Sequence, residues 1–421
     1  MQRQQIRIAV TDLEAGMYVA QLDRPWIETP FPLQGFVIRS YRDVQNLLPY
    51  CKHVYIDVER GKPPRPQELR GAPAPAGASM DRPLRAQIGR YPRTTPMARE
   101  LRTAARSRRR LLASLDALSR DAGGASAEAL AATRKASATL VGSVIRNPDA
   151  MVWLARIQQH AGSVFEHGVR ACTWAVVLGR HLGMSSSALE SLALGTVLAD
   201  VGVLRLPPGT REEEPGVEGA AAAGWRQHVQ HGLDLLHDSP DVDELALGVV
   251  AAHHERHDGR GYPRGLRGDA IPYLARVAGL AQAYDRLLNP RDGADALTTA
   301  EALASLYRQR GEAFQQALVD EFIQAIGPYP PGTLVILSNG VAGVVLEQTR
   351  EHRLRPSVLQ LTDREGHLRR RLRVVNLAGA QQDRALHVER AADPAELGID
   401  LGRIHRVWFE RRVARGISFA A

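Results

Sequence analysis

Hydrophobic residues recur at intervals of three and four over much of the chain, which is the spacing of helices that bury one face. The clearest segments lie between residues 150 and 326. They are Val164–Leu182, Ser187–Leu198, Gly224–His237, Val242–Ala252, Tyr273–Leu288 and Thr299–Ile326. Two-residue alternation is nearly absent there, so the pattern predicts an all-helical domain over residues 149–326, in which side chains from several helices can converge on one site.

The pattern is different on the N-terminal side of this domain. The segments QIRIAV and HVYIDV predict strands that flank a short helix, hence a small α/β domain over residues 1–60. Residues 61–97 are rich in Pro and Gly and predict a linker, because proline fixes φ and removes a backbone donor. Residues 98–148 are Ala-rich and predict a helical connector that either pairs between subunits or packs on the helical domain.

After residue 326 the pattern becomes that of β-structure. TLVILS and VAGVVLEQ flank Asn339-Gly340, which is typical of a hairpin turn, and SVLQLTD and RLRVVNL follow. These segments predict a β-rich appendix over residues 327–392. The tail at residues 393–421 contains Trp408 and Phe409 and has no assignable pattern. The predicted fold class is therefore α+β and multidomain.

Composition and charge limit the kinds of partner that we expect this protein to bind. With 421 residues the chain is long enough for two or three domains, and its formal net charge is +8. The basic residues are almost all arginines spread along the whole chain, and no aromatic residues are interleaved with them, so we expect no nucleic-acid partner. The densest cluster, residues 106–110, is interpreted as a solvated helix face.

Membrane association and disulfide bonding are not expected either. No uninterrupted apolar run approaches the roughly 18 residues that a membrane span requires, and the N-terminus lacks the order of a signal peptide. The pattern favours a cytoplasmic protein. Cys51 and Cys172 form no CxxC pair and are expected to be reduced core residues.

One short segment carries most of the chemical information. Residues 253–263 read His253-His254-Glu255-Arg256-His257-Asp258-Gly259-Arg260-Gly261-Tyr262-Pro263. Three histidines within five residues are hard to explain by packing, because each buried imidazole needs a partner for both ring nitrogens. A shared metal ion would satisfy several of them. This HHE-x-x-DG-x-GYP pattern resembles the signature of the HD-GYP family, bacterial metal-dependent phosphodiesterases that act on cyclic di-GMP.

The resemblance extends over residues 165–290 and implies an HD-type helical bundle. The segment from residue 12 to residue 40 is also similar to the small N-terminal domain of unknown function found in one subgroup of the family. By position, the resemblance implies a set of metal ligands: His167, Asp200, His228, His253 and His254. Asp200 is also the expected catalytic residue. The implied substrate loop is Arg260, Gly261, Tyr262 and Pro263, in which Tyr262 would stack on a base and Arg260 would meet a phosphate. Alternatively, this loop merely closes a turn.

Three positions depart from the family pattern. Ala199 and Val203 stand where the family writes the His and Lys of His-Asp-x-Gly-Lys, and Gln282 stands where it has a later Asp. Ala199 and Gln282 remove two of the four ligands of the first metal, and neither side chain replaces them, since alanine has no donor atom and glutamine is a poor ligand for transition metals. We therefore expect one divalent ion, such as iron or manganese, or none.

Three hypotheses follow. The first is a degenerate HD-GYP protein that senses cyclic di-GMP or binds signalling proteins through its N-terminal domain or its GYP loop. The second is a metal-dependent phosphodiesterase of reduced activity. The third is an interaction protein that binds neither nucleotide nor metal. A homodimer is compatible with each of them, and the metal content separates the third from the other two.

Overall fold

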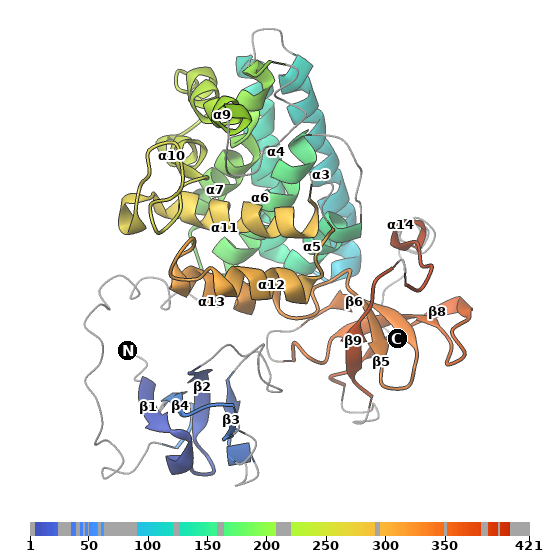
Figure 1. Cartoon of the computed structure of the whole chain (residues 1–421). Helices are drawn as coiled ribbons and strands as arrows, with labels where there is room; N and C mark the ends of the chain where they lie inside the picture. Colours follow the sequence, from blue (N-terminus) through green and yellow to red (C-terminus); the bar gives the residue numbers. More distant parts are fainter. Residues whose placement is uncertain are drawn as a thin grey trace. The chain divides into compact units, whose positions relative to one another are not determined.

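The structure is a computed structural model. It describes residues 5–23, 35–38, 43–44, 47–48, 50–57, 60–62, 91–120, 126–157, 164–207, 220–290, 295–348, 352–379, 386–394 and 396–404. The chain divides into two compact units, Met1–Arg82 and Pro83–Ala421. Figure 1 shows the elements of each unit. All of the predicted site residues belong to the larger unit.

The smaller unit is built on a four-stranded antiparallel sheet. Its strands are β1 (Gln5–Ala9), β2 (Tyr18–Leu22), β3 (Phe36–Val37) and β4 (His53–Asp57), in the order β1-β4-β2-β3, with the 3-10 helix η1 (Val10–Asp12) after β1. The two predicted strands pair with each other, and Ile8, Val54 and Ile56 lie in the core between them and the rest of the unit. The helix predicted between them falls partly outside the described residues.

The larger unit begins with a helical bundle. Its helices are α3 (Met97–Arg120), α4 (Ala127–Arg146), α5 (Pro148–Ile157), α6 (Val164–His181), α7 (Ser186–Leu198), η4 (Val201–Arg205), α9 (Ala220–Leu236), α10 (Glu244–Ala252), η5 (Gly268–Ala270), α11 (Tyr273–Leu288), α12 (Thr299–Arg308) and α13 (Gln316–Ile326). One hydrophobic core joins α3 to α13 and continues into the following sheet. Together with the two sheets, this bundle confirms the predicted α+β class.

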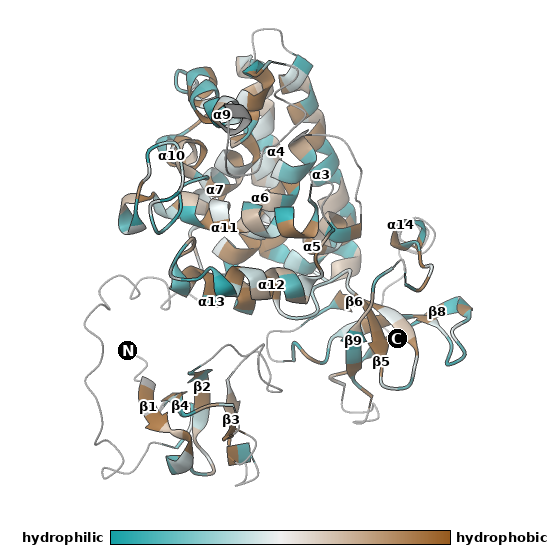
Figure 2. Ribbon diagram, in the orientation of Figure 1, coloured by the Kyte–Doolittle hydropathy of each residue, from teal (hydrophilic) through white to brown (hydrophobic). Residues whose placement is uncertain are grey.

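Helices α3 and α4 are part of this core. Leu111 and Leu115 of α3 and Leu140 of α4 are fully buried in it, so the connector packs on the bundle of its own chain. Figure 2 shows polar and apolar positions mixed along both helices, as in helices with one buried face. The interpretation of residues 106–110 as a solvated face is wrong for Arg108. This side chain is buried and pairs with Glu166 of α6 at 2.5 Å.

The prediction of one helix over Thr299–Ile326 is also wrong. The segment forms α12 and α13, which are separated by a turn at residues 309–315. The first helix ends at Arg308, and Gly311 lies in the following turn with a φ of +78°, a left-handed conformation that only glycine adopts readily and that does not fit a continuous helix. The apolar spacing continues on both sides of the turn, which is why the periodicity alone suggests a continuous helix.

A five-stranded antiparallel sheet follows the bundle. It contains β5 (Leu334–Leu337), β6 (Ala342–Glu347), β7 (Ser357–Thr362), β8 (Leu368–Asn376) and β9 (Val388–Ala391), in the order β8-β7-β6-β5-β9. Leu334 and Val344 face the bundle core, whereas Val335 and Val345 pack in a second cluster. The alternation of the strands therefore places one face of the sheet on the bundle. A short helix, α14 (Leu401–Ile404), follows, and Trp408 and Phe409 lie outside the described residues.

In the part of the chain that the structure describes, one segment meets the length and composition of a membrane span. It is Ser186–Arg205, and 78% of its most apolar window is buried inside the protein. Its apolar character is therefore explained by its position in the core, between α6 and α10. This segment carries Asp200, and its burial is what places that carboxylate inside the bundle.

The buried ion pair Arg108–Glu166 gives a test of the packing of α3 against α6. We expect Glu166→Gln to lower the free energy of unfolding by about 3 kcal/mol, because it leaves the Arg108 charge buried without its carboxylate partner. The matched control is Asp241→Asn, which removes the exposed pair Arg134–Asp241 and should cost less than about 1 kcal/mol. Urea unfolding of both variants provides the measurement, and equal losses would contradict the buried pair.

Candidate metal centre

A close backbone contact places Asp200 beside helix α9. Asp200 follows the end of α7, and Gly202, two residues later, lies directly against α9. A Cβ atom added at Gly202 would lie 1.9 Å from the carbonyl oxygen of His228 and 2.4 Å from the amide nitrogen of Gly232. Only glycine allows this approach. The contact brings the Asp200 carboxylate next to the His228 imidazole.

Three acceptor atoms converge at this point. Asp200 Oδ1 lies 3.6 Å from both His228 Nε2 and His253 Nε2, and the two Nε2 atoms are 3.4 Å apart. On their other edges, His228 Nδ1 donates to the carbonyl oxygen of Trp225 at 2.7 Å and His253 Nδ1 donates to that of Val250 at 2.9 Å. Since a carbonyl oxygen only accepts, each Nδ1 carries the proton and each Nε2 presents a lone pair.

His254 completes a group of four. One ligand atom from each of Asp200, His228, His253 and His254 lies within 4.8 Å of the others, and all four residues are buried. Within the described residues, Asp200 Oδ1 and His254 Nε2 have no hydrogen-bond partner. Buried acceptors that face one another without a donor are unfavourable, and a cation between them removes that cost. The residues therefore fit a divalent metal, for which imidazole and carboxylate are common ligands.

The protonation states suit metal binding. Burial lowers the pKa of His228 to about 4 and holds the pKa of His254 well below its ordinary value, so both rings are neutral at pH 7. The cluster thus presents neutral imidazoles at His228 and His254, the form of histidine that binds metals.

His167, the fifth predicted ligand, is not part of this group. It lies on α6, where its Nδ1 pairs with Asp285 Oδ2 of α11 at 2.8 Å. The same carboxylate accepts from Arg170 Nε at 3.0 Å and from Trp174 Nε1 at 3.3 Å. His167 Nε2 has no partner within the described part of the chain. Orientation of an imidazole by a buried carboxylate is a common feature of metal-binding histidines, and it is retained here.

The three departures from the family pattern are all buried. Ala199 is fully buried, and Gln282 is 2% exposed. Neither the oxygen nor the nitrogen of the Gln282 amide has a partner within the described residues. Val203 packs with Leu206 and Trp225 in a small apolar cluster, so hydrophobic side chains fill the surroundings of the position where the family has a lysine.

The GYP loop lies directly against the cluster. The Tyr262 ring stacks on the His254 ring, with 4.4 Å between centroids and 20° between planes. The Arg226 guanidinium lies over the Tyr262 ring at 5.0 Å. Gly261 is needed here because a Cβ atom would lie 2.3 Å from the amide nitrogen of Arg256. The side chain of Arg260 is 89% exposed and faces solvent.

Sequence reasoning did not assign a role to Glu255. Its carboxylate is buried and accepts hydrogen bonds from the amides of Arg264 and Leu266, both at 2.8 Å. It therefore fixes the return of the loop after Pro263 and is not one of the four grouped ligands. The sequence did contain a signal for this role, an acidic residue ahead of a glycine-rich turn, because carboxylates often accept hydrogen bonds from turn amides.

Comparisons with known proteins show which domains the chain contains and which proteins it resembles. The model of a domain of unknown function, DUF3391, matches residues 5–133, and an HD domain model matches residues 154–318. A cyclic di-GMP phosphodiesterase from Pseudomonas aeruginosa is 31% identical over 354 residues, which are 84% of this chain and 84% of that protein. A cyclic di-GMP phosphodiesterase response regulator from Xanthomonas campestris is 33% identical over 35% of this chain and 39% of its own length.

A solved HDG"Y"P protein from Bdellovibrio bacteriovorus is similar at a TM-score of 0.46 and 17% identity, over 76% of this chain and 98% of that one. The alignment with the relative from Pseudomonas aeruginosa covers most of both chains, and the HD domain model covers the part of the bundle that holds the four grouped residues. The chain belongs to the HD-GYP family of HD-domain proteins, and its DUF3391 match reaches from the N-terminal unit through α3 into α4. The resemblance inferred from its signature is thus confirmed.

The role of Glu255 can be tested without reference to activity. We expect Glu255→Ala to lower the free energy of unfolding by about 2 kcal/mol, because two part-buried amides lose their acceptor. Hydrogen exchange at the amides of Arg264 and Leu266 should accelerate, and the Glu255→Gln control should show a smaller effect because it keeps one acceptor oxygen. Unchanged exchange in the alanine variant would mean that another group fixes the loop.

Proposed function

We propose that this chain is a cyclic di-GMP signalling protein that binds one divalent metal ion and that senses the nucleotide, or engages a protein partner, with little or no hydrolysis. The observation that supports it most directly is the asymmetry of the site. Asp200, His228, His253 and His254 form a compact ligand group, whereas the neighbouring positions 199 and 282 offer a methyl group and an amide.

The intact half of the site supports metal binding. Nδ1 of both His228 and His253 is fixed by a carbonyl oxygen, so the Nε2 lone pairs keep their direction without an ion. When bound, a divalent ion would supply charge neutralisation at a phosphate and would lower the pKa of a bound water. The loop residues would then orient the nucleotide, with the exposed Arg260 available to a phosphate and Tyr262 to a base.

The depleted half argues against efficient hydrolysis. Phosphodiester cleavage by a pair of metals depends on a clamp on both the attacking and the leaving oxygen, and one ion supplies only one side of it. With Ala199 and Gln282 in place, two ligands of the other metal ion are missing. Val203 makes buried apolar contacts where the family has a lysine, so a positive charge is missing as well. A loss of about 3 to 4 kcal/mol of transition-state stabilisation lowers a rate by about 10²–10³.

Two alternative functions differ from this proposal. A phosphodiesterase of reduced activity is favoured by one observation, the His167 ring that Asp285 still holds with its Nε2 free of partners in the described structure. An interaction protein that binds neither metal nor nucleotide would leave the four buried ligand groups without a function. Protein partners would bind at the N-terminal domain or the GYP loop, and a cytoplasmic location is part of the proposal.

The first test measures metal and nucleotide on the same sample. We expect equilibrium dialysis of the full chain against Mn²⁺ or Fe²⁺ to give about one ion per chain, since a transition metal needs about four ligands and only one such group is present among the described residues. Cyclic di-GMP should bind in a titration, with turnover far below about 1 s⁻¹.

Two variants provide the controls. His228→Ala should abolish metal binding because it removes a central ligand. His167→Ala should keep the same number of bound ions with a lower affinity, because His167 lies outside the four-residue group. Turnover near about 1 s⁻¹ with added manganese or iron would contradict the proposed loss of hydrolysis. A protein that binds neither metal nor cyclic di-GMP would favour the interaction-protein alternative.

The second test restores the missing ligands. Ala199→His together with Gln282→Asp should raise the metal content toward two ions per chain, whereas each single change should do little, because ligands that act as a unit are strongly non-additive. The measurement is metal stoichiometry, with phosphodiesterase activity as a second readout that also depends on Val203. Unchanged metal content in a well-folded double variant would mean that packing has closed that half of the site.

A further inference from the structure

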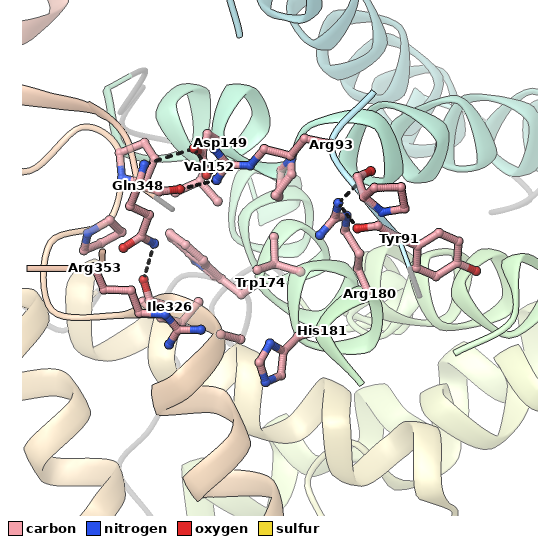
Figure 3. Close-up of a pocket in the computed structure, with 16 residues that line it drawn as sticks. Tyr91, Arg93, Asp149, Val152, Trp174, Arg180, His181, Ile326, Gln348 and Arg353 are labelled. Carbon is pink, nitrogen blue, oxygen red and sulfur yellow. Dashed lines mark hydrogen bonds and ion pairs between the residues drawn. The ribbon is translucent and has the colours of Figure 1, made fainter. Parts of the chain in front are cut away.

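A cavity of about 530 Å³ lies in the larger unit, away from the four grouped metal ligands. It is bounded by helices α5, α6 and α13, by residues 91–93, and by segments that flank the second sheet. Trp174, Val152 and Val177 provide apolar walls, and Pro330 and Pro331 add to them. Figure 3 shows Trp174 among the labelled lining residues, between the polar groups drawn on either side. Pockets of this size, with apolar walls and a few polar groups, are typical of small-ligand sites.

The charged lining residues are mostly cationic. Arg93, Arg180, Arg353 and His181 line the cavity, against a single carboxylate, Asp149. Asp149 pairs with Arg93 at 2.7 Å, as Figure 3 shows. Burial raises the pKa of Asp149 to about 6 despite this pair. Each guanidinium also donates to oxygens of the protein: Arg93 to Asp149, Arg180 to the carbonyl oxygens of Ile145 and Tyr91, and Arg353 to Gln324. Three positive charges around one volume nevertheless favour an anion.

The protein itself fixes the amide of Gln348 in the lining. The Gln348 side chain donates through Nε2 to the carbonyl oxygen of Ile326 at 2.7 Å, which fixes the amide. Its Oε1 is buried and has no hydrogen-bond partner within the described residues. A ligand that carries a phosphate and a flat apolar body would meet both the positive charges and the Trp174 wall of the cavity, and nucleoside monophosphates combine these two groups.

Two buried side chains, Trp174 and Asp285, connect the cavity to His167. Trp174 lines the cavity, and its Nε1 donates to Asp285 Oδ1 at 3.3 Å. The other oxygen of Asp285 holds His167 Nδ1 at 2.8 Å. Asp285 is fully buried and Trp174 is 1% exposed, so a displacement of the indole changes the hydrogen bonds of the carboxylate directly.

We propose that this cavity is an effector site for a small phosphate-bearing ligand of mononucleotide size, and that Trp174 transmits its occupancy through Asp285 to His167. The binding half of the inference stands on the cavity alone. The coupling half rests on the proposed metal centre. The two halves have separate readouts, so the failure of one is distinguishable from the failure of the other.

The binding experiment uses guanosine 5′-monophosphate as the probe, titrated into the full chain by calorimetry. We expect Arg353→Gln to weaken binding at least tenfold, which corresponds to about 1.4 kcal/mol. The matched control is Arg371→Gln, which removes the same charge from an exposed position on β8 outside the cavity lining and should bind normally. Ala325→Phe, which fills the cavity from α13, should also abolish binding and serves if Arg353→Gln does not fold.

Three results would overturn the effector site. The first is that the wild-type chain does not bind guanosine monophosphate, and the second is that Arg353→Gln and Ala325→Phe both bind it as tightly as the wild type. The third is that Asp200→Asn abolishes binding while Arg353→Gln leaves it intact. The last result would place the nucleotide at the metal cluster instead. Inorganic phosphate and guanosine, titrated separately, should each bind at least tenfold more weakly than the monophosphate, because each satisfies only part of the lining.

The coupling experiment measures Mn²⁺ affinity by competition with a chelator, with and without saturating guanosine monophosphate. We expect the nucleotide to change the Mn²⁺ dissociation constant at least threefold in the wild-type chain and in Trp153→Phe. The change should vanish in Trp174→Phe, which keeps the aromatic ring but cannot donate to Asp285. An unchanged Mn²⁺ affinity in a chain that binds both ligands would overturn the coupling, and a chain that binds no Mn²⁺ would overturn the proposed function that the coupling requires.

Discussion

The close contact between Gly202 and helix α9 is the constraint on which the metal centre depends. It removes the space for any side chain between η4 and the backbone at His228, and so holds Asp200 within 3.6 Å of two imidazole nitrogens. The two histidines are fixed in turn by carbonyl oxygens of their own helices. The ligand geometry is therefore set by backbone packing, which explains how three mutually repelling acceptors are kept together inside the bundle.

The site has two halves with different physical characters. Around Asp200 the polar atoms are arranged for an ion, and the protonation states of His228 and His254 agree with that arrangement. Around Gln282 and His167, by contrast, buried polar atoms lack partners within the described residues. Asp285 keeps the orientation of His167, so the second half has lost ligands while retaining part of the scaffold that would support them.

Much of the fold could be predicted from the sequence because apolar spacing reports burial directly. This spacing predicts the helical bundle, the N-terminal strands and the C-terminal hairpin with the strands that follow it. Two features could not be predicted this way. The turn at Gly311 keeps the apolar spacing on both sides, and Arg108 looks like its exposed neighbours until Glu166 is placed opposite it by tertiary packing. For the site, motif position predicted the four residues that the structure brings together, and their role as ligands stays a prediction. The links from Trp174 and Arg170 to Asp285 depend on contacts more than 100 positions apart in sequence.

The Tyr262 ring has a consequence for how fast a ligand can enter. The ring stacks on His254 and also lies near the Arg226 guanidinium, so under the proposed function a nucleotide base would stack on it by displacing a neighbour. His254 is buried and Arg226 is exposed, so the neighbour displaced would be Arg226. The base would then replace a cation on the aromatic face, and the released guanidinium would remain at the mouth of the site, where the phosphates of the entering ligand arrive. Under the proposed function, entry would thus be a substitution at an occupied surface, with its rate limited by the departure of a side chain.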